Sequence, residues 1–168
     1  MRCSLVCLAT VVGLGVWLPS SPARGAEPAA RRAALLRSSG GGGAASIPLL
    51  RNALQDENMV VRRTAARLLG EIGTAAEAVL VQALGNEDSV VRQVALKGLL
   101  ALETEAHEAI LAVALDDVDM GQRLIAVREL AGTHPQSEGV KQLLAKAAKD
   151  SDDAVLSVAS RGLWSFSR

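Results

Sequence analysis

A pattern of about thirty residues recurs along most of this chain of 168 residues. The stretch VVRRTAARLLG begins at residue 60 and VVRQVALKGLL at residue 90, with valine, arginine, alanine and leucine in the same places. A third copy has Arg123 at the position of Arg62 and Arg92, and a fourth places Leu156 there. A fixed period of this length is typical of a stacked array of repeats, in which each unit buries its apolar face only against its neighbours.

Each copy predicts two helices joined by an acidic turn. In the first copy, Val61, Ala65, Leu68, Leu69 and Ile72 fall on one face of a helix. A shorter apolar segment precedes that helix, and the turns between the two read QDEN, GNED, DDVD and KDSDD in successive copies. Asp and Asn favour such turns because their side chains accept hydrogen bonds from the free amides of a helix start. The prediction is an all-α fold, an α-α superhelix of about four helical hairpins.

The domain organisation follows from this pattern. We predict a repeat domain over residues 46–168, preceded by a flexible linker over residues 27–45 that contains a run of glycines. Residues 30–37 loosely match the repeat, so a vestigial helix is the alternative to a tether there. The four repeats are expected at residues 46–73, 74–103, 104–132 and 133–168.

Composition limits both the core and the partners. Hydrophobic residues make up 49% of the chain and aromatic residues only 2%, so the core must consist of small and aliphatic side chains, which suits closely packed helices. The 18 basic residues balance the 18 acidic residues. We therefore expect no nucleic-acid partner, because no net field would draw the chain to a polyanion.

The first 26 residues are predicted to be a secretory signal. Arg2 gives a short basic start, an apolar run covers residues 5–18, and small residues follow, with cleavage expected near 23–26. An uncleaved membrane anchor is the alternative, but the apolar run is short for a bilayer. Both cysteines, Cys3 and Cys7, lie in this segment, so the mature chain would have no thiol. The prediction is an exported protein, periplasmic or extracellular, with no membrane insertion after cleavage.

Residues 47–73, which read IPLLRNALQDENMVVRRTAARLLGEIG, resemble a HEAT repeat of the short kind found in phycobilisome-lyase-like proteins. The shared marks are Pro48 early in the first helix, the aspartate at its end, and the pairs Val-Arg, Ala-Ala, Leu-Gly and Ile-Gly that follow. The resemblance covers about residues 46–166 and implies a HEAT-like solenoid. The signatures of ankyrin and tetratricopeptide repeats, which have similar periods, do not occur in the sequence.

The resemblance also implies a ladder of ion pairs. In HEAT arrays the arginine after the valine commonly pairs with an aspartate of the turn between the helices. A structural role is expected, because a bidentate guanidinium–carboxylate pair is a good clamp between repeats. Leu156 would end such a ladder. The implied members are Arg62, Arg92 and Arg123, which would meet Asp56, Asp88 and Asp117 or their neighbours.

A second column of basic residues recurs in the second helix of each copy. We name it the basic stripe; it consists of Arg67, Lys97, Arg128 and Arg161. These residues fall between the apolar positions, so they should project outward and suit an acidic segment of a protein partner. A plainer interpretation is a solvated helix surface, because basic residues late in a helix suit its dipole and Glu71 can pair with Arg67.

Residues that carry chemistry are scarce in the sequence. The carboxylates fall in turns as helix caps, and neither a nucleophile elbow nor a phosphate-binding loop occurs. Some HEAT-like hydroxylases hold two irons with repeated His-Glu pairs, but His107-Glu108 occurs once and cannot build such a site. We predict a non-catalytic scaffold that mediates protein–protein interaction, with no cofactor and no metal. The alternative is an accessory subunit or a lyase- or hydroxylase-like enzyme of the HEAT-repeat class.

Overall fold

The computed structural model describes residues 27–40, 43–102, 104–132 and 137–166. These residues form α-helices and two short 3-10 segments, with no strand among them. The helices are α1 (Pro28–Ser39), α2 (Ile47–Ala53), α3 (Met59–Ile72), α4 (Glu77–Ala83), α5 (Ser89–Leu100), α6 (His107–Leu115), α7 (Met120–Gly132), α8 (Glu138–Ala147) and α9 (Asp153–Ser165).

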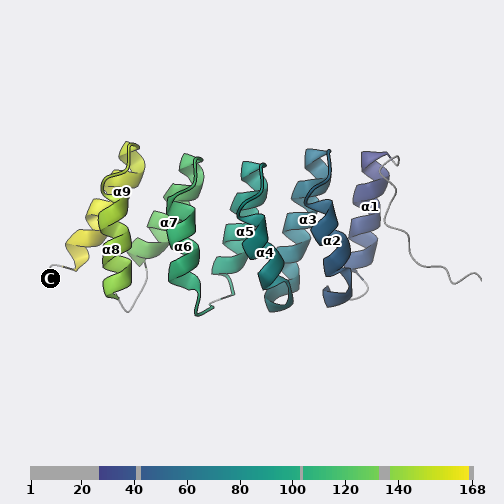
Figure 1. Ribbon diagram of the computed structural model, residues 1–168, viewed down its shortest axis with the longest axis horizontal. Helices are drawn as coiled ribbons and strands as arrows, with labels where there is room; N and C mark the ends of the chain where they lie inside the picture. Colours follow the sequence, from purple (N-terminus) through teal and green to yellow (C-terminus); the bar gives the residue numbers. More distant parts are fainter. Residues whose placement is uncertain (1–26, 41–42, 103, 133–136, 167–168) are drawn as a thin grey trace, which may run out of the picture.

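The helices stack side by side into two rows (Figure 1). The shorter first helices α2, α4, α6 and α8 form one row, and the second helices α3, α5, α7 and α9 lie behind them. Each first helix packs against the second helix that follows it in the chain, and each second helix packs against the next one along the stack. The predicted all-α, HEAT-like superhelix of helical hairpins is confirmed.

The acidic turns start the second helices in the way that their composition predicts. Asn58 accepts a hydrogen bond at its side-chain oxygen from the Val60 amide, and Asp88 accepts one from the Val90 amide. Asp152 caps α9 in the same way. Each of these side chains satisfies an amide that would otherwise lack a partner at the helix start.

One continuous aliphatic core runs the length of the stack, between the two rows. Leucines and alanines from both rows fill it, and its buried members include no aromatic residue among the residues that the structure describes. Fully buried examples from successive helices are Leu50, Leu69, Leu80, Leu99, Leu111, Leu130 and Leu144. The neighbours therefore supply the burial that a single hairpin lacks.

Small residues set how closely the second helices approach. A Cβ added at Gly98 would lie 3.4 Å from the Gly70 Cα atom, and one added at Gly162 would lie 3.2 Å from the Ala131 Cβ atom. These positions bring α3 close to α5, and α7 close to α9. Helices α5 and α7 approach each other less closely. The interaxial distance depends on the side chains at the contact, so the seam between α5 and α7 is the wider one.

The prediction of a linker over residues 27–45 is wrong for most of that range, where α1 forms and packs against α3. Leu35 is buried in the common core, and Arg31 is buried beside it, because the two residues lie one helical turn apart on the face toward α3. Helix α1 stands at the end of the row of second helices (Figure 1). The alternative of a helix over residues 30–37 was the better one.

The predicted secretory signal, residues 1–26, lies outside the described residues, as do both cysteines. Among the helices that the structure describes, none has the length and apolar character needed to cross a bilayer.

Candidate interaction surface and the arginine ladder

The best-formed ladder pair joins Arg92 of α5 to Asp117, in the turn before α7. Arg92 donates from Nε to Asp117 Oδ2 at 2.7 Å and from Nη2 to Oδ1 at 2.8 Å. Both side chains are about nine-tenths buried, with exposed fractions of 11% and 9%. The planar guanidinium matches both carboxylate oxygens at once, so the contact is a bidentate clamp between repeats.

The same guanidinium also holds the turn of its own repeat. Arg92 Nη1 donates to the carbonyl oxygens of Asn86 at 2.8 Å and Glu87 at 3.1 Å. Arg62 and Arg123 repeat this pattern with the carbonyls of their own turns. Each ladder arginine therefore satisfies turn carbonyls in one repeat while it binds a carboxylate of the next.

The ladder pairs are offset from the simplest alignment. Arg62 does not bind the Asp56 carboxylate in its own turn; its Nη2 donates to Asp88 Oδ2, one repeat further on, at 3.1 Å. Arg123 likewise reaches forward to Asp150, with distances of 2.7 and 3.1 Å. Asp56 is bound from the preceding helix by Arg31, at 2.9 Å. Every pair thus links adjacent units of the stack.

In one of the turns, a residue at a different position supplies the ladder carboxylate. In the other three turns the ladder carboxylate is the residue whose side chain accepts a hydrogen bond from the amide two positions later, as Asp117 does from Asp119. In the α4–α5 turn that position is held by Asn86, whose amide group donates to the Leu54 carbonyl at 3.0 Å. An amide cannot pair with a guanidinium as a carboxylate does, so Arg62 uses Asp88, the N-cap residue.

Three ladder residues escaped the sequence prediction: Arg31, Arg63 and Asp150. Arg63 adds a second guanidinium on Asp88, with its Nε 3.0 Å from Oδ2. Arg31 could have been found by aligning residues 30–37 with the later copies, where it matches Arg62. Asp150 falls in the fourth acidic turn, KDSDD, at the place of Asp117.

Electrostatics favours the charged form of the ladder carboxylates. Burial of Asp117 raises the pKa of its carboxyl, but hydrogen bonds from Arg92 and a backbone amide outweigh burial and hold the pKa below its usual value. The pKa values of Asp56 and Asp88 are lowered by the same balance. At Asp150 the arginine hydrogen bond is the largest influence, and it also lowers the pKa.

The basic stripe lies on the exposed side of the second helices. All four residues are exposed. Arg67 forms an ion pair with Glu71, one turn further along α3, and Arg161 donates weakly to the Ser157 carbonyl at 3.4 Å. Within the part of the chain that the structure describes, Lys97 and Arg128 form no ion pair or hydrogen bond through their side chains.

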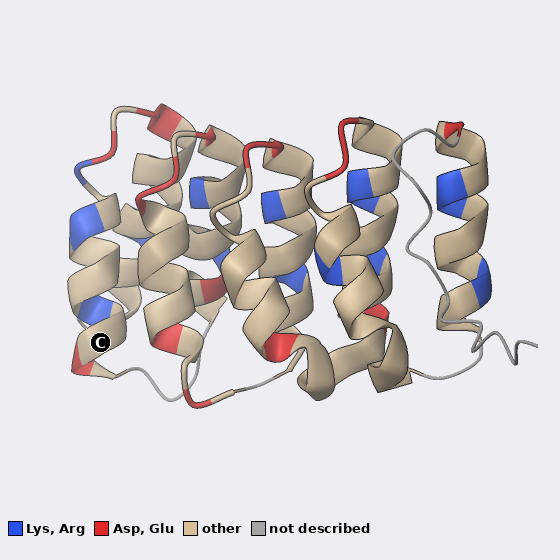
Figure 2. Cartoon of the chain, turned by 45° about the vertical axis from the view of Figure 1, so that its right-hand side comes forward, with Lys and Arg blue, Asp and Glu red and all other residues tan. Residues whose placement is uncertain are grey.

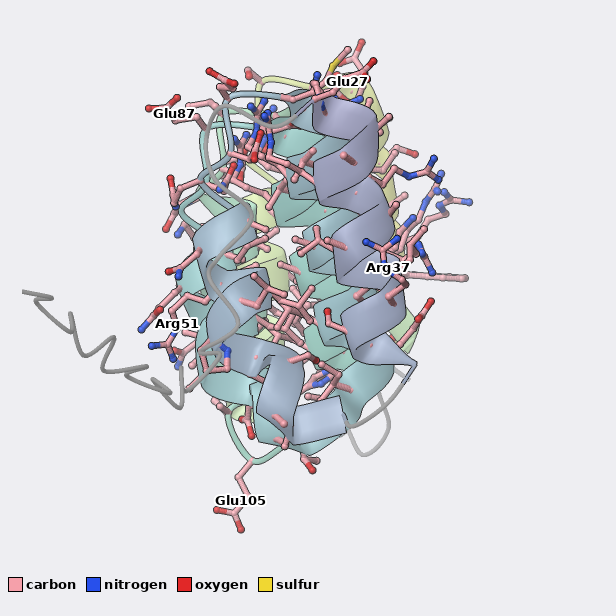
Figure 3. All side chains as sticks on the ribbon, turned by 90° about the vertical axis from the view of Figure 1, so that its right-hand side faces the viewer. Glu27, Arg37, Arg51, Glu87 and Glu105 are labelled. Carbon is pink, nitrogen blue, oxygen red and sulfur yellow. The ribbon has the colours of Figure 1, made fainter. Side chains whose placement is uncertain are left out.

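The acidic turns and the basic stripe lie on different parts of the molecule. In Figure 2 acidic residues line the turns along one edge of the stack, others lie near the opposite ends of the helices, and basic residues lie along the helices. Figure 3 looks along the stack and shows Arg37, on α1, on the side of the second helices, with further basic groups on the same side. Arg51, on α2, lies on the opposite side, with the first helices. The basic stripe and the acidic turns are therefore different surfaces.

His107 and Glu108 do not converge on a common point. His107 Nε2 lies 3.8 Å from Glu129 Oε1, whereas Glu108 Oε1 accepts a hydrogen bond from Ser137 Oγ at 2.6 Å. In the described ranges no three His, Cys, Asp or Glu side chains are grouped so that they could hold a metal ion. The predicted site residues therefore form two separate sets, the ladder between the repeats and the stripe on the exposed side of the second helices.

Comparison with known proteins bears on the first part of the array. The family described as HEAT repeats matches residues 23–100, a range that includes α1 to α5. No curated protein matches the chain. Residues 23–100 are thus similar to HEAT repeats, and the chain as a whole has the fold of an all-α, HEAT-like superhelix.

Proposed function

We propose that this protein is an exported, non-catalytic scaffold that binds another protein along its row of second helices. The observation that carries the proposal is the contrast between two sets of cations on the same helices. The ladder arginines bind the carbonyls of their own turns and a carboxylate of the next repeat. Lys97 and Arg128, by contrast, are exposed and unpaired among the described residues. HEAT repeats commonly mediate protein interactions, which supports the same conclusion.

An acidic segment is the partner chemistry that the stripe suits. Helix α5 carries two basic residues and no acidic one, and the carboxylates of the described turns lie along another edge. A column of cations on a chain of zero formal net charge makes a local positive field, which selects a partner of opposite sign without attracting every polyanion.

Export is supported by the sequence of the first 26 residues, with one basic residue, an apolar run and then small residues. The protein would then act in the periplasm or outside the cell, with the repeat array free of the membrane. The absence of cysteine after residue 7 suits an oxidising compartment, where a free thiol is a liability.

The test is an affinity pull-down from the native cell envelope with the mature protein as bait, followed by mass spectrometry. Recovery of a protein that rebinds the purified bait directly supports the scaffold. The competing class is an accessory subunit or a lyase- or hydroxylase-like enzyme of the same repeat family. A stoichiometric metal in the protein purified from its native source, with turnover that depends on that metal, would favour this alternative.

A further inference from the structure

We infer that the basic stripe recognises an acidic segment in an extended polyproline II conformation, whose carboxylates recur about every three residues, with Lys97 and Arg128 as its central anchors. This inference rests on the proposed function, and it specifies what the partner must present. It follows from the geometry of the repeats and from the unequal states of the four stripe residues.

The spacing comes from the stack itself. Each stripe residue stands at the equivalent place on consecutive second helices, so neighbouring cations are one helix-to-helix distance apart. Packed helices lie about 8–10 Å apart, and the less close approach of α5 and α7, which carry the two central anchors, favours the long end of that range. A polyproline II chain advances about 3.1 Å per residue and brings every third side chain back to the same face, so three residues cover one step. Consecutive acidic residues would therefore fall out of register with the stripe.

The stripe residues are not equivalent. Arg67 is partly neutralised by Glu71, with which it forms an ion pair on the same helix. Arg161 retains a weak contact with a carbonyl of its own helix. Lys97 and Arg128 have no such contact among the described residues, so a partner carboxylate meets no competitor there. These two residues also stand on either side of the wider seam between α5 and α7.

The composition of helix α5 also supports Lys97 and Arg128 as the central anchors. Between Ser89 and Leu100 it carries no acidic residue, and its other cation, Arg92, is bound to Asp117. In α7 the single carboxylate, Glu129, approaches His107 of the first-helix row. The middle of the stripe is thus a place where positive charge is exposed without a compensating carboxylate from its own helices.

The inference is tested with labelled synthetic peptides and the mature protein, by fluorescence anisotropy at low and at moderate salt. One peptide carries glutamate at every third position, one for each stripe residue, separated by serine and glycine. A second has the same composition with the glutamates adjacent, and a third has glutamine in their place. We expect the spaced peptide to bind most tightly, and its affinity to fall as salt rises.

Variants locate the contact. Lys97→Glu with Arg128→Glu should weaken binding of the spaced peptide about tenfold or more. Arg51→Glu with Lys149→Glu changes the net charge equally at exposed residues outside the stripe and should leave affinity nearly unchanged. Glu71→Gln releases Arg67 and should tighten binding. Equal losses in the two reversal variants would overturn the inference, because they would indicate a net-charge effect only.

Other results would also overturn it. These are the absence of peptide binding at low salt, equal affinity for the adjacent and spaced glutamates, or binding to anionic lipid vesicles or RNA without binding to the spaced peptide. The scaffold proposal is judged separately by the envelope pull-down. A partner recovered equally by wild type and by the Lys97→Glu/Arg128→Glu variant would leave the scaffold standing and reject the stripe as its contact.

Discussion

Arg92 and Asp117 form a bidentate ion pair across the boundary between the second and third described hairpins, with donor–acceptor distances of 2.7 and 2.8 Å. The pair spans α5 and the turn before α7, the two second-row helices that approach each other less closely than their neighbours do. Gln93 adds a longer contact to Asp119, at 3.3 Å, on the same boundary. The polar clamp therefore lies where the close backbone contacts of the stack are fewest.

Replacing Arg92 by alanine should destabilise the protein by about 1–3 kcal/mol. The change leaves the Asp117 carboxylate, of which 9% is exposed, without its guanidinium, and removes two hydrogen bonds to turn carbonyls. Chemical denaturation at neutral pH measures the loss. An unchanged free energy of unfolding would mean that the clamp carries no net stability.

Arg62→Ala is the matched comparison, and it should cost less than Arg92→Ala. Asp88 keeps Arg63 when Arg62 is removed, because both arginines contact its carboxylate. Asp117 has no second arginine among the described residues. The double variant Arg62→Ala/Arg63→Ala should then lose more than the sum of the single losses, since only the second removal leaves the carboxylate unpaired. Strict additivity would contradict this shared-partner arrangement.

Lowering the pH should destabilise the repeat array, because the ladder carboxylates become protonated. Their pKa values in the folded state lie below the ordinary value of 3.8, so the unfolded chain takes up protons first as the pH falls. The stabilising contribution is therefore complete above about pH 4 to 5 and is lost as the pH falls through 3.8 toward the lower pKa values of the folded state. Melting temperatures between neutral pH and pH 2.5 check this window.

The variant Asp117→Asn tests whether the ladder carboxylates cause the loss of stability at low pH. This variant should be less stable at neutral pH and should lose less further stability on acidification, because one of the lowered pKa values is gone. Glu87→Gln is the control, since Glu87 is exposed and its side chain forms no ion pair with the described residues. Identical pH profiles for wild type and Asp117→Asn would show that the ladder is not the acid-sensitive element.

A buried glutamine breaks the pattern of the core. Gln122 occupies the place held by Val61, Val91 and Val155 in the other repeats, and all four side chains are buried. Its side-chain oxygen has no hydrogen-bond partner in the structure, although Gln122 contributes to the low pKa of Asp117. An unpaired buried oxygen costs about 1–3 kcal/mol, so Gln122→Val should keep or raise the melting temperature.

The reciprocal change tests the same reasoning. Val91→Gln places an amide where the structure provides an apolar environment, and it should destabilise the protein by about 1–3 kcal/mol. Loss of stability in Gln122→Val comparable to that in Val91→Gln would show that the glutamine is satisfied and belongs to the clamp network.

The mature chain should begin between residues 24 and 27. Small residues and the end of the apolar run converge there, and cleavage at any of these points leaves α1, which begins at Pro28, complete. Intact-mass analysis of protein isolated from the envelope measures the new terminus. Retention of Met1 would contradict export by a cleaved signal.

The repeat pattern was enough to predict the helical hairpins, because apolar positions at helical spacing and capping residues in the turns both act locally. The stripe residues were likewise predicted to be exposed, since Lys97 and Arg128 lie between core positions of their helices. Which carboxylate each ladder arginine meets depends on the packing of adjacent repeats. Asn86 stands where the other turns have an aspartate, and this single difference is sufficient to make Arg62 pair with Asp88 instead.

Two further features could not be predicted from local patterns. Helix α1 has a weak apolar face, and its order comes from contacts with α3, in particular Leu35 in the core and Arg31 on Asp56. Gln122 would be expected on a surface, yet the register of its helix carries it into the core. Tertiary packing overrides local preference in both cases.

The ladder is expected to stabilise the array and the stripe to bind the partner, and one experiment compares these two roles. An envelope pull-down is performed in parallel with wild type, Arg92→Ala and Lys97→Glu/Arg128→Glu, each checked for its melting temperature. We expect Arg92→Ala to melt lower than wild type but still to recover the partner below its melting temperature. We expect the stripe variant to melt like wild type and to recover little partner. Recovery by the stripe variant at the wild-type level, at low salt, would contradict this division of roles.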